Sequence, residues 1–515
     1  MRRPKVEPLW LAMAAAAGLF LWLRSLVPFS AAGGAGYDDA LFVRLADHIL
    51  RGTWLGPYDE LTLSKGPFFS LWIAGAWRLR LPLALSEALV LALAGWLFVA
   101  ALRPQVRRAW PLLVLFILLL GDPLGYNLED LRVVREGLYA PLTVLVMALA
   151  ACWLAAHGRP GAGPWLWSAA LGLALAACWL TREEAVELVP ALAFLALAAS
   201  GRGLRLRPLL LAAAAAATAL AGVGLLRWQN HKTYGLWDVV DLKQREYRAA
   251  YGALSRVLPE PAARHVPVSR RALAEAAAAS PAFKRLLPLF NPAWAEHGCA
   301  MEGLEACDGE LRGGWFRFAL RDAAAKAGCY ASAAAARDCY RAVAEEVDAA
   351  CAQGRLRCLP PRDTWVPPWR AAYAGLTARS LGRAVYTLVC LPGLDIRPGF
   401  SEDGRWLGLF QRLVRGRLFP LRDRWTVQGE VVMDALLDGH ALFLSRRAEV
   451  FSSLQQSFGP LDRKHTRITF TLVSDCWDES CALVVQGRQG TLASIPAPEL
   501  LRGKEFPLGR LRVLV

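Results

Sequence analysis

The stretch PLALSEALVLALAGWLFVAAL, residues 82–102, contains one charged side chain, Glu87, in 21 residues. A helix needs about 20 mostly apolar residues to cross the hydrocarbon core of a bilayer. Only helices and closed barrels satisfy their backbone polar groups in lipid, and a run this rich in Ala and Leu favours a helix. A second run, RPLLLAAAAAATALAGVGLL at 207–226, has the same character. These runs predict helices that span a membrane.

Apolar segments of this kind repeat through the first 226 residues, and hydrophobic residues make up 55% of the whole chain. Short polar connections separate the segments, as expected for helices packed in a bundle. The sequence therefore predicts a polytopic α-helical membrane domain over residues 1–226. We expect about seven spans: 8–28, 82–102, 109–124, 137–156, 164–180, 185–200 and 207–226.

The orientation follows from the loops, because short cytoplasmic loops carry an excess of Lys and Arg. The amino terminus and every second loop are rich in Arg and nearly free of acids, whereas the alternate loops hold most of the acids. With the amino terminus inside and seven spans, residues 227–515 lie outside. We expect a bacterial inner (cytoplasmic) membrane protein whose soluble carboxyl-terminal half is in the periplasm. The net charge is +15, but the sequence contains no basic tail and no Lys-rich run. The predicted partner is therefore the membrane and not nucleic acid.

Cysteine usage gives an independent indication of the compartment. Six of the eleven cysteines fall within about sixty residues, which is typical of a disulfide framework in an oxidising compartment. A zinc site needs closer C-x2-C spacing. Six cysteines allow fifteen pairings, and we favour pairs of sequence neighbours. The six are Cys299, Cys307, Cys329, Cys339, Cys351 and Cys358.

The soluble half divides by composition into three regions. Residues 227–375 predict an extracytoplasmic helical domain that bears the disulfides, and residues 376–424 predict a linker region, although 376–394 is an alternative eighth span. Residues 425–515 predict a β-rich domain, so the whole soluble region is α+β. Runs at 468–473 and 481–486 flank a polar turn, and we expect a hairpin there with Cys476 and Cys481 as a staple across it.

The first outer loop, residues 29–81, contains GYDDALFVRLADHILRGTWLGPY at 36–58 and LSKGP at 63–67. Leu41, Leu45 and Ile49 recur at helical spacing, which predicts a helix from Asp39 onward. One of the two acids, Asp38 or Asp39, would be expected to cap that helix. A cap needs one short polar side chain, so two consecutive carboxylates exceed this requirement. Lys65 lies at the far end of the loop. Its alternative interpretation is a lysine at a helix start that extends its ammonium group to water, which is called snorkelling.

Two further charged clusters lie in outer loops. Glu129–Glu136 holds Arg132 and Arg135, and Arg132 and Glu136 have the spacing that places them on one helix face. Thr181–Glu184 forms a charged turn between two apolar segments, which is costly unless it reaches water or a polar cavity. Ordinary ion pairs and acids favoured by the helix dipole are the alternative interpretations of these clusters.

Paired acids after the first span, a short helix and a downstream Lys65-Gly66-Pro67 resemble the GT-C membrane glycosyltransferases. The similarity is closest to the family-39-like branch, which includes protein mannosyltransferases and lipid A aminoarabinose transferases, and it covers residues 1–226. That family often has Asp-Glu where this chain has Asp38-Asp39. The resemblance implies transfer of a sugar from a polyprenyl-phosphate donor to a hydroxyl of a glycan, lipid or protein acceptor on the extracytoplasmic face.

Such a transfer needs a general base near the acceptor oxygen and positive charge at the leaving phosphate. Asp38 is the candidate base, and Asp39 would orient the acceptor or help to hold a metal. The candidate ligands of the donor phosphate are Lys65, Arg132, Arg135 and Arg182. The candidate substrate-binding residues are Tyr37, His48, Glu136, Tyr139, Glu183 and Glu184.

His48 and Asp47 lie near the acidic pair, but no familiar ligand spacing accompanies them, so a divalent metal stays an open alternative and no other cofactor is expected. A non-catalytic membrane scaffold or lipid-binding protein is the alternative function. A transporter would need charges midway along its spans. Glu87 is nearly alone there, which disfavours transport.

Overall fold

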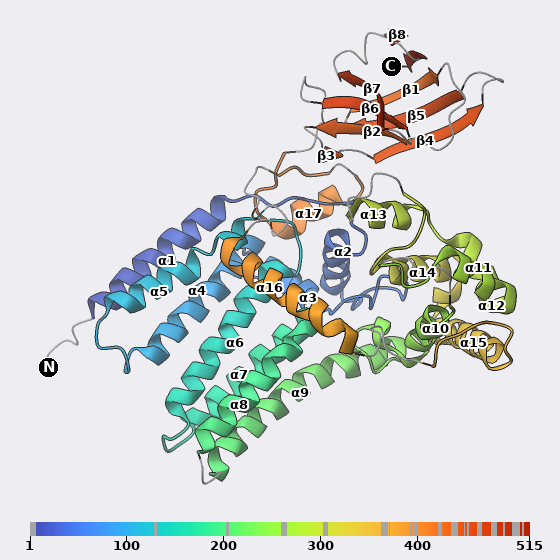
Figure 1. The fold of residues 1–515 in the computed structure, drawn as a ribbon. Helices are drawn as coiled ribbons and strands as arrows, with labels where there is room; N and C mark the ends of the chain where they lie inside the picture. The colour runs from blue at the N-terminus through green and yellow to red at the C-terminus, as the bar shows by residue number, and fades with distance from the viewer. Residues whose placement is uncertain are drawn as a thin grey trace. The chain divides into compact units, whose positions relative to one another are not determined.

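The computed structural model describes residues 7–127, 131–201, 205–258, 265–301, 307–361, 369, 371–391, 394, 399–402 and 404–420, and beyond these the strands between 425 and 514. The chain forms two compact units, Met1–Pro420 and Leu421–Val515. The first unit is helical and the second consists of strands (Figure 1).

The amino-terminal part of the first unit is a bundle of apolar helices joined by an outer loop that contains two short helices. Figure 1 shows the bundle. Its helices are α1 (Pro8–Leu26), α2 (Asp39–Leu50), α3 (Phe68–Arg78), α4 (Leu83–Leu102), α5 (Trp110–Leu120), α6 (Glu136–Ala156), α7 (Gly163–Thr181), α8 (Leu188–Ser200) and α9 (Leu206–Tyr234).

Within the described residues, five helices are long and apolar enough to cross a membrane: α1, α4, α6, α7 and α9. They indicate a membrane protein, as the sequence predicts. The predicted spans 109–124 and 185–200 correspond to the shorter helices α5 and α8, with 11 and 13 residues. These two helices are below the length that a single crossing needs.

Contacts between loops show which helix ends lie together. At one end, Arg103 after α4 pairs with Glu7 before α1, and Arg207 at the start of α9 donates to the carbonyl of Arg159 before α7. At the opposite end, the segment before α6 contacts both the start of α2 and the last residue of α7. The chain segments that contain the short helices α5 and α8 therefore each connect one end of the bundle to the other.

Close contacts between small residues hold neighbouring helices of the bundle together. Gly172 of α7 lies against α9, where an added Cβ would be 2.3 Å from the carbonyl oxygen of Ala215. Small residues of this kind let helix backbones approach in membranes, where apolar side chains alone give no preference for helix over lipid.

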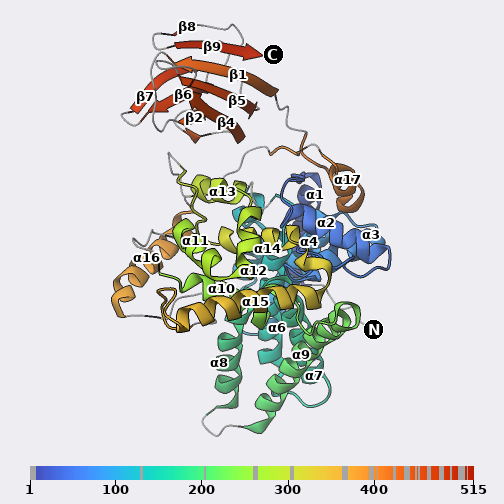
Figure 2. The same ribbon diagram turned by 90° about the vertical axis from the view of Figure 1, so that its right-hand side faces the viewer.

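A second core, separate from that of the bundle, belongs to a helical domain that follows α9 (Figure 2). Each of its three disulfides joins sequence neighbours, which confirms the predicted framework: Cys299–Cys307, Cys329–Cys339 and Cys351–Cys358. Its helices are α10 (Arg245–Ser255), α11 (Arg270–Ala279), α12 (Pro281–Leu286), α13 (Ala293–Met301), α14 (Trp315–Lys326) and α15 (Ala333–Ala352).

A buried ion pair joins this helical domain to the outer loop. Arg321 of α14 is fully buried and donates to Asp241 at 2.7 and 3.2 Å and to the carbonyl of Glu60. Tyr58 donates to the same carboxylate at 3.2 Å, and the backbone N–H of Asp241 donates to Leu63 at 2.9 Å. These contacts place the carboxyl-terminal ends of α1 and α9 on the same side of the bundle, as the predicted topology requires.

The segment after the helical domain contains α16 (Ala374–Cys390) and α17 (Leu407–Val414). α17 packs against α2 and α3. Backbone hydrogen bonds join Phe29 to Arg417 and Phe419, and Glu402 to Ala31. Residues that the sequence predicts to form a linker therefore pack against the outer loop.

The carboxyl-terminal unit contains two antiparallel sheets, with the strand orders β4-β5-β1-β9-β8 and β3-β2-β6-β7. The predicted hairpin of 468–473 with 481–486 is wrong. β1 and β4 occupy both edges of β5, so β6 pairs in the other sheet. Cys476 of the predicted staple lies outside the described residues. The strands are β1 (Trp425–Met433), β2 (Ala441–Arg446), β3 (Glu449–Val450), β4 (Ser453–Pro460), β5 (Thr466–Ser474), β6 (Cys481–Gly487), β7 (Gly490–Pro496), β8 (Glu505–Phe506) and β9 (Gly509–Leu514).

Removal of the buried guanidinium should destabilise the first unit. We expect Arg321→Met to lower the free energy of unfolding by about 3–5 kcal/mol, because it leaves the Asp241 carboxylate buried without a counter-charge. Denaturant unfolding of the purified protein in detergent measures the change. Arg341→Met is the matched control. Arg341 is half-exposed in its pairs with Asp338 and Glu246, so we expect a loss of at most about 1 kcal/mol. Equal losses in the two variants would contradict the structural role of Arg321.

Candidate active site

The two consecutive acids at the start of α2 have different partners. Asp39, in the first turn, is fully buried and receives two hydrogen bonds from Arg132, at 2.6 and 3.3 Å. Asp38 stands at the capping position but makes no capping hydrogen bond. Its side chain is 46% exposed and pairs with Lys65 instead. The capping interpretation is therefore wrong for Asp38, because a buried lysine takes its carboxylate.

Burial changes the protonation of Asp39. Loss of contact with water raises the pKa of this carboxyl to about 6, and the neighbouring Arg132 guanidinium opposes the rise without cancelling it. Asp39 is thus a carboxyl that gains or loses its proton near neutral pH, beside a half-exposed acid that faces a cation.

A close backbone approach positions Lys65. Its neighbour Gly66 lies against the end of α7, where a Cβ would be 2.2 Å from the carbonyl oxygen of Leu180. Only glycine permits this contact, which brings the Lys65 side chain over the ring of Phe42, with 5.6 Å from Nζ to the ring centre. The side chain is only 13% exposed, and burial lowers the pKa of Lys65, although the Asp38 carboxylate opposes that effect. Its burial beside Asp38 does not fit the snorkelling alternative, in which the ammonium group would extend to water.

Arg135 lies over the same ring. Its guanidinium is 5.9 Å from the ring centre of Phe42 and donates to the carbonyl of Thr181 at 3.2 Å. Glu183 lies 3.9 Å from it. The outer loop, the segment before α6 and the end of α7 therefore meet around one aromatic ring.

Arg182 extends this group of charges along the end of α7. We call the group the cluster, and its members are Asp38, Asp39, Lys65, Arg132, Arg135, Glu136, Arg182, Glu183 and Glu184. It pairs with Glu136 and with Glu184, the latter at 3.0 Å, and its guanidinium lies 5.5 Å from the ring centre of Tyr139. The hydrogen bond from Arg182 lowers the pKa of Glu184 to about 2. The expected shared helix face of Arg132 and Glu136 is wrong. α6 begins only at Glu136, and Arg132 stays outside the helix, bridged to Ser30.

Two predicted substrate-binding residues have structural contacts of their own. Tyr37 donates to Asp322 of α14 at 2.6 Å and packs on Trp294 and Phe318. Burial raises the pKa of Tyr37 well above its usual value. The ring of His48 lies against Gly56 and within 3.2 Å of the Thr53 hydroxyl. Tyr37 therefore contacts the helical domain, and His48 contacts a later part of the outer loop.

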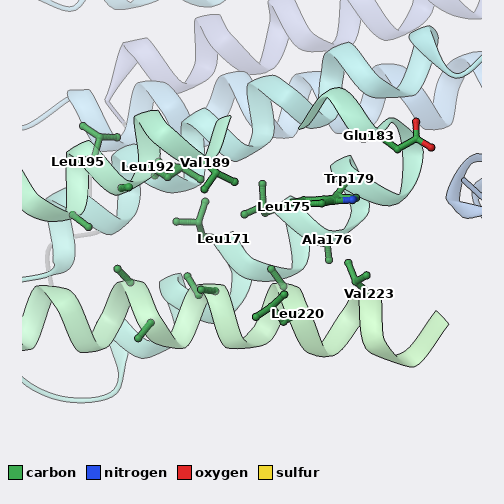
Figure 3. A pocket seen from close by; sticks show the side chains of 18 of the residues that line it. Leu171, Leu175, Ala176, Trp179, Glu183, Val189, Leu192, Leu195, Leu220 and Val223 are labelled. Carbon is green, nitrogen blue, oxygen red and sulfur yellow. The ribbon is translucent and has the colours of Figure 1, made fainter. Parts of the chain in front are cut away.

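An apolar cavity of about 980 Å³ lies between α7, α8 and α9. Figure 3 shows leucine and valine side chains along it, with Glu183 at one end. Gly66 and Glu183 line the cavity, and they are also the neighbour of Lys65 and the partner of Arg135. The cavity therefore reaches the charged cluster at its polar end. Arg227, Asp238 and Lys243 line the cavity as well.

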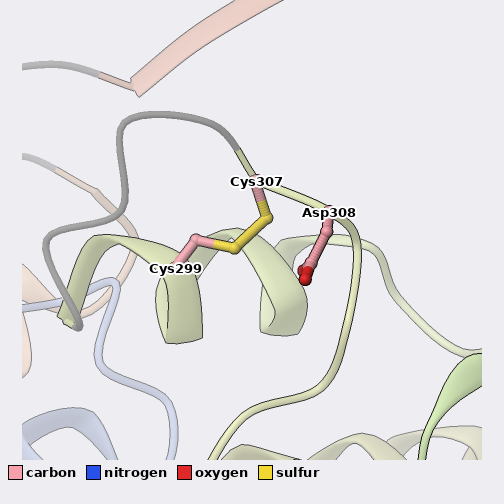
Figure 4. Close-up of side chains that lie close together, drawn as sticks. All are labelled: Cys299, Cys307 and Asp308. Carbon is pink, nitrogen blue, oxygen red and sulfur yellow. A yellow bond between two sulfur atoms is a disulfide. The ribbon is translucent and has the colours of Figure 1, made fainter. Parts of the chain in front are cut away.

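A divalent metal would need several ligand side chains that lie close together. In that part of the chain, one group of three potential ligand residues lies close together: Cys299, Cys307 and Asp308 (Figure 4). The two cysteines form a disulfide, so neither offers a thiolate, and Asp308 pairs with Arg312 at 2.5 Å. Asp38 and Asp39 belong to no such group within the described residues.

Sequence reasoning identified most charged residues of the cluster but missed the parts that bring them together. The sequence placed Phe42 in the helix predicted from Asp39 onward and Gly66 in the Lys65-Gly66-Pro67 motif, but it assigned neither residue a role in the site. A lone aromatic residue carries no signal for a cation-binding role. The glycine beside a candidate lysine did carry one, because glycine often marks a close backbone approach.

The pKa of Asp39 gives a prediction on pH. A carboxyl whose pKa is raised by folding contributes stability that is fully present below its unfolded pKa, about 3.9, and is lost as pH rises through its folded value near 6. We expect wild-type protein to lose up to about 3 kcal/mol between pH 4 and 7 from this group. Asp39→Asn should lack this component in unfolding measured at a series of pH values. An unchanged pH slope in the variant would contradict the assignment.

No family model, curated protein or solved structure matches the chain.

Proposed function

We propose that this protein is a membrane glycosyltransferase of the GT-C type, which transfers a sugar from a polyprenyl-phosphate donor to an acceptor hydroxyl. The observation that carries the proposal is the meeting of the apolar cavity with the acid-and-cation cluster at Gly66 and Glu183. A lipid-linked sugar has these two parts, a long hydrocarbon chain and an anionic head.

The cavity suits the hydrocarbon chain of the donor. Side chains such as Leu171, Leu192 and Leu220 line it, and a volume of about 980 Å³ is at the upper end of ordinary ligand pockets. α8 and α9 also expose large apolar residues, among them Phe194 and Leu225. A chain longer than the cavity can therefore continue along a surface that faces lipid.

Cations at the polar end suit the donor phosphate. Lys65, Arg135 and Arg182 lie on the cluster side, and Arg227 and Lys243 line the cavity itself. A phosphate held there would leave the sugar next to Asp38, the half-exposed acid. Positive charge fixed in place before the reaction stabilises the charge that develops on the leaving phosphate.

The resting ion pairs supply an order of events. The donor phosphate competes with the Asp38 carboxylate for Lys65, and its arrival frees that carboxylate. The acceptor oxygen then attacks the anomeric carbon while Asp38 takes the hydroxyl proton. The bond between the anomeric carbon and the phosphate oxygen breaks, and its electron pair leaves with polyprenyl phosphate.

We place the reaction on the extracytoplasmic face of a bacterial inner membrane, with the soluble half in the periplasm. The three disulfides support this side, because disulfides persist in oxidising compartments. The acid-poor loops at the opposite end of the bundle support it through the positive-inside rule.

A non-catalytic lipid-binding protein is the second candidate. It is favoured by the pairing of Lys65, Arg132, Arg135 and Arg182, each of which lies beside an acid and is already neutralised. Such a protein would use the cavity without the base. The two candidates differ in whether Asp38 is needed for turnover.

Asp38→Asn should reduce sugar transfer about 10²–10⁴-fold, the range for loss of a general base. Transfer is measured with purified protein in nanodiscs and a pool of lipid-linked sugars extracted from cells. Asp47→Asn is the matched control, because Asp47 lies on the same helix and pairs with Arg51 and Arg412. We expect this variant to keep its activity.

An Asp38→Asn variant that transfers sugar at the wild-type rate would show that Asp38 is not the general base. No transfer by the wild type, with lipid still bound, would favour the lipid-binding candidate. Mass spectrometry of a deletion strain separates the two in cells, because loss of the transferase should accumulate a polyprenyl-phosphate sugar.

Filling the cavity should weaken donor binding. Ala216 of α9 lines the cavity, whereas Ala221 of the same helix is exposed and does not. We expect Ala216→Trp to raise the KM for the lipid-linked donor at least several-fold, and Ala221→Trp to leave it unchanged. Steady-state kinetics with increasing donor measures the difference. Equal KM values in the two variants would show that the carrier chain lies elsewhere.

A further inference from the structure

α16 is an isolated helix with an amphipathic sequence. Every residue from Ala374 to Cys390 is exposed, and Figure 2 shows the helix at the edge of the helical part of the chain. Leu381, Val385 and Leu388 follow at spacings of four and three, so they share one face of the helix. Leu388 is 73% exposed. In the described chain, α16 packs on no other helix of the bundle or the helical domain.

The opposite face of α16 carries positive charge. Arg379 and Arg383 are four residues apart, and Cys390 follows seven residues later on the same side. The helix contains no acid. Trp369, shortly before the helix, is exposed as well, and tryptophan is enriched where protein meets the headgroup region of a bilayer.

Both flanks of α16 are fixed at the same end of the bundle. On the amino-terminal side, Leu359 donates to the carbonyl of Arg256 in the helical domain at 2.8 Å. On the carboxyl-terminal side, Glu402 donates to the carbonyl of Ala31, just after α1, at 2.9 Å. The buried pair of Arg321 with Asp241 holds the helical domain and the outer loop together at that end.

This arrangement argues against the alternative of an eighth span at 376–394. A single crossing would leave one flank on the wrong side of the membrane. α16 has 17 residues, about 25 Å at 1.5 Å per residue, which is at the lower limit for one crossing of a hydrocarbon core of about 30 Å.

We propose that α16 lies in the surface of the same membrane, parallel to its plane, on the side that carries the helical domain. Its stripe of Leu381, Val385 and Leu388 would enter the boundary between headgroups and acyl chains, and Arg379 and Arg383 would contact anionic headgroups. The occupant of the exposed face is thus a lipid surface. Charge complementarity with anionic lipid and the position of both flanks support it over another protein chain. This inference does not depend on the proposed transfer activity.

Cys390 provides a built-in probe for the test. Within the described chain, the other free cysteines, Cys152 and Cys178, are buried. An environment-sensitive fluorophore attached to Cys390 of the full chain reports on the arginine face. The same fluorophore on Leu388→Cys, in a Cys390→Ser background, reports on the apolar face. Cys390→Ser alone measures background labelling.

The proteins are reconstituted in nanodiscs with phosphatidylglycerol and phosphatidylcholine. At position 388 we expect blue-shifted emission, quenching by lipid with a nitroxide near the top of its acyl chain, and protection from iodide. At position 390 we expect emission typical of water and several-fold faster quenching by iodide. Replacement of phosphatidylglycerol by phosphatidylcholine should reduce the difference between the two positions, and so should Arg379→Gln with Arg383→Gln.

Two results would overturn the proposal. One is equal iodide access at positions 388 and 390 in anionic nanodiscs. The other is protection of position 388 without quenching by nitroxide lipid, accompanied by efficient disulfide cross-linking of Leu388→Cys between two copies. Normal gel-filtration behaviour of both labelled proteins ensures that the comparison is made on folded chains.

Discussion

The buried pair of Arg321 with Asp241 sets the geometry of the outer part of this protein. Taking two charges out of water is costly, and the cost is recovered only when their hydrogen bonds are satisfied. Here the Arg321 guanidinium donates hydrogen bonds to Asp241 and to the carbonyl of Glu60. The Tyr58 hydroxyl donates to the same Asp241 carboxylate. The outer loop is thereby fixed to the helical domain two residues before Lys65, where Leu63 accepts a backbone hydrogen bond.

Ion pairs that water can reach have a different effect from the buried pair of Arg321 with Asp241. The carboxylate of Asp38 is half-exposed, and the pairs of Arg182 with Glu136 and Glu184 are partly solvated. Such pairs contribute little to stability. An anionic ligand can therefore replace the acids at small cost. Burial separates a pair that holds the architecture from the more exposed pairs, which the phosphate of the proposed lipid-linked donor would displace.

Much of the candidate site could be predicted, because charged residues in outer loops are visible one by one in the sequence. Their pairing could not. Asp38 has the position of a helix cap but pairs with Lys65, since Gly66 allows that loop to contact Leu180. Arg132 has helical spacing to its neighbours but remains outside α6 and pairs with Asp39. Contacts over long sequence distances decided both outcomes.

The sequence by itself determined where the long apolar helices lie and that the clustered cysteines form disulfides, because these depend on composition and short spacing. It gave only a preference for pairs of neighbouring cysteines. Only the tertiary structure decided which charges meet, where the cavity between α7, α8 and α9 opens, and that β5 and β6 belong to different sheets. It also left every residue of α16 exposed in the part of the chain that the structure describes. The physical reason is that local patterns fix an element and its faces, whereas the neighbour of each face depends on distant parts of the chain.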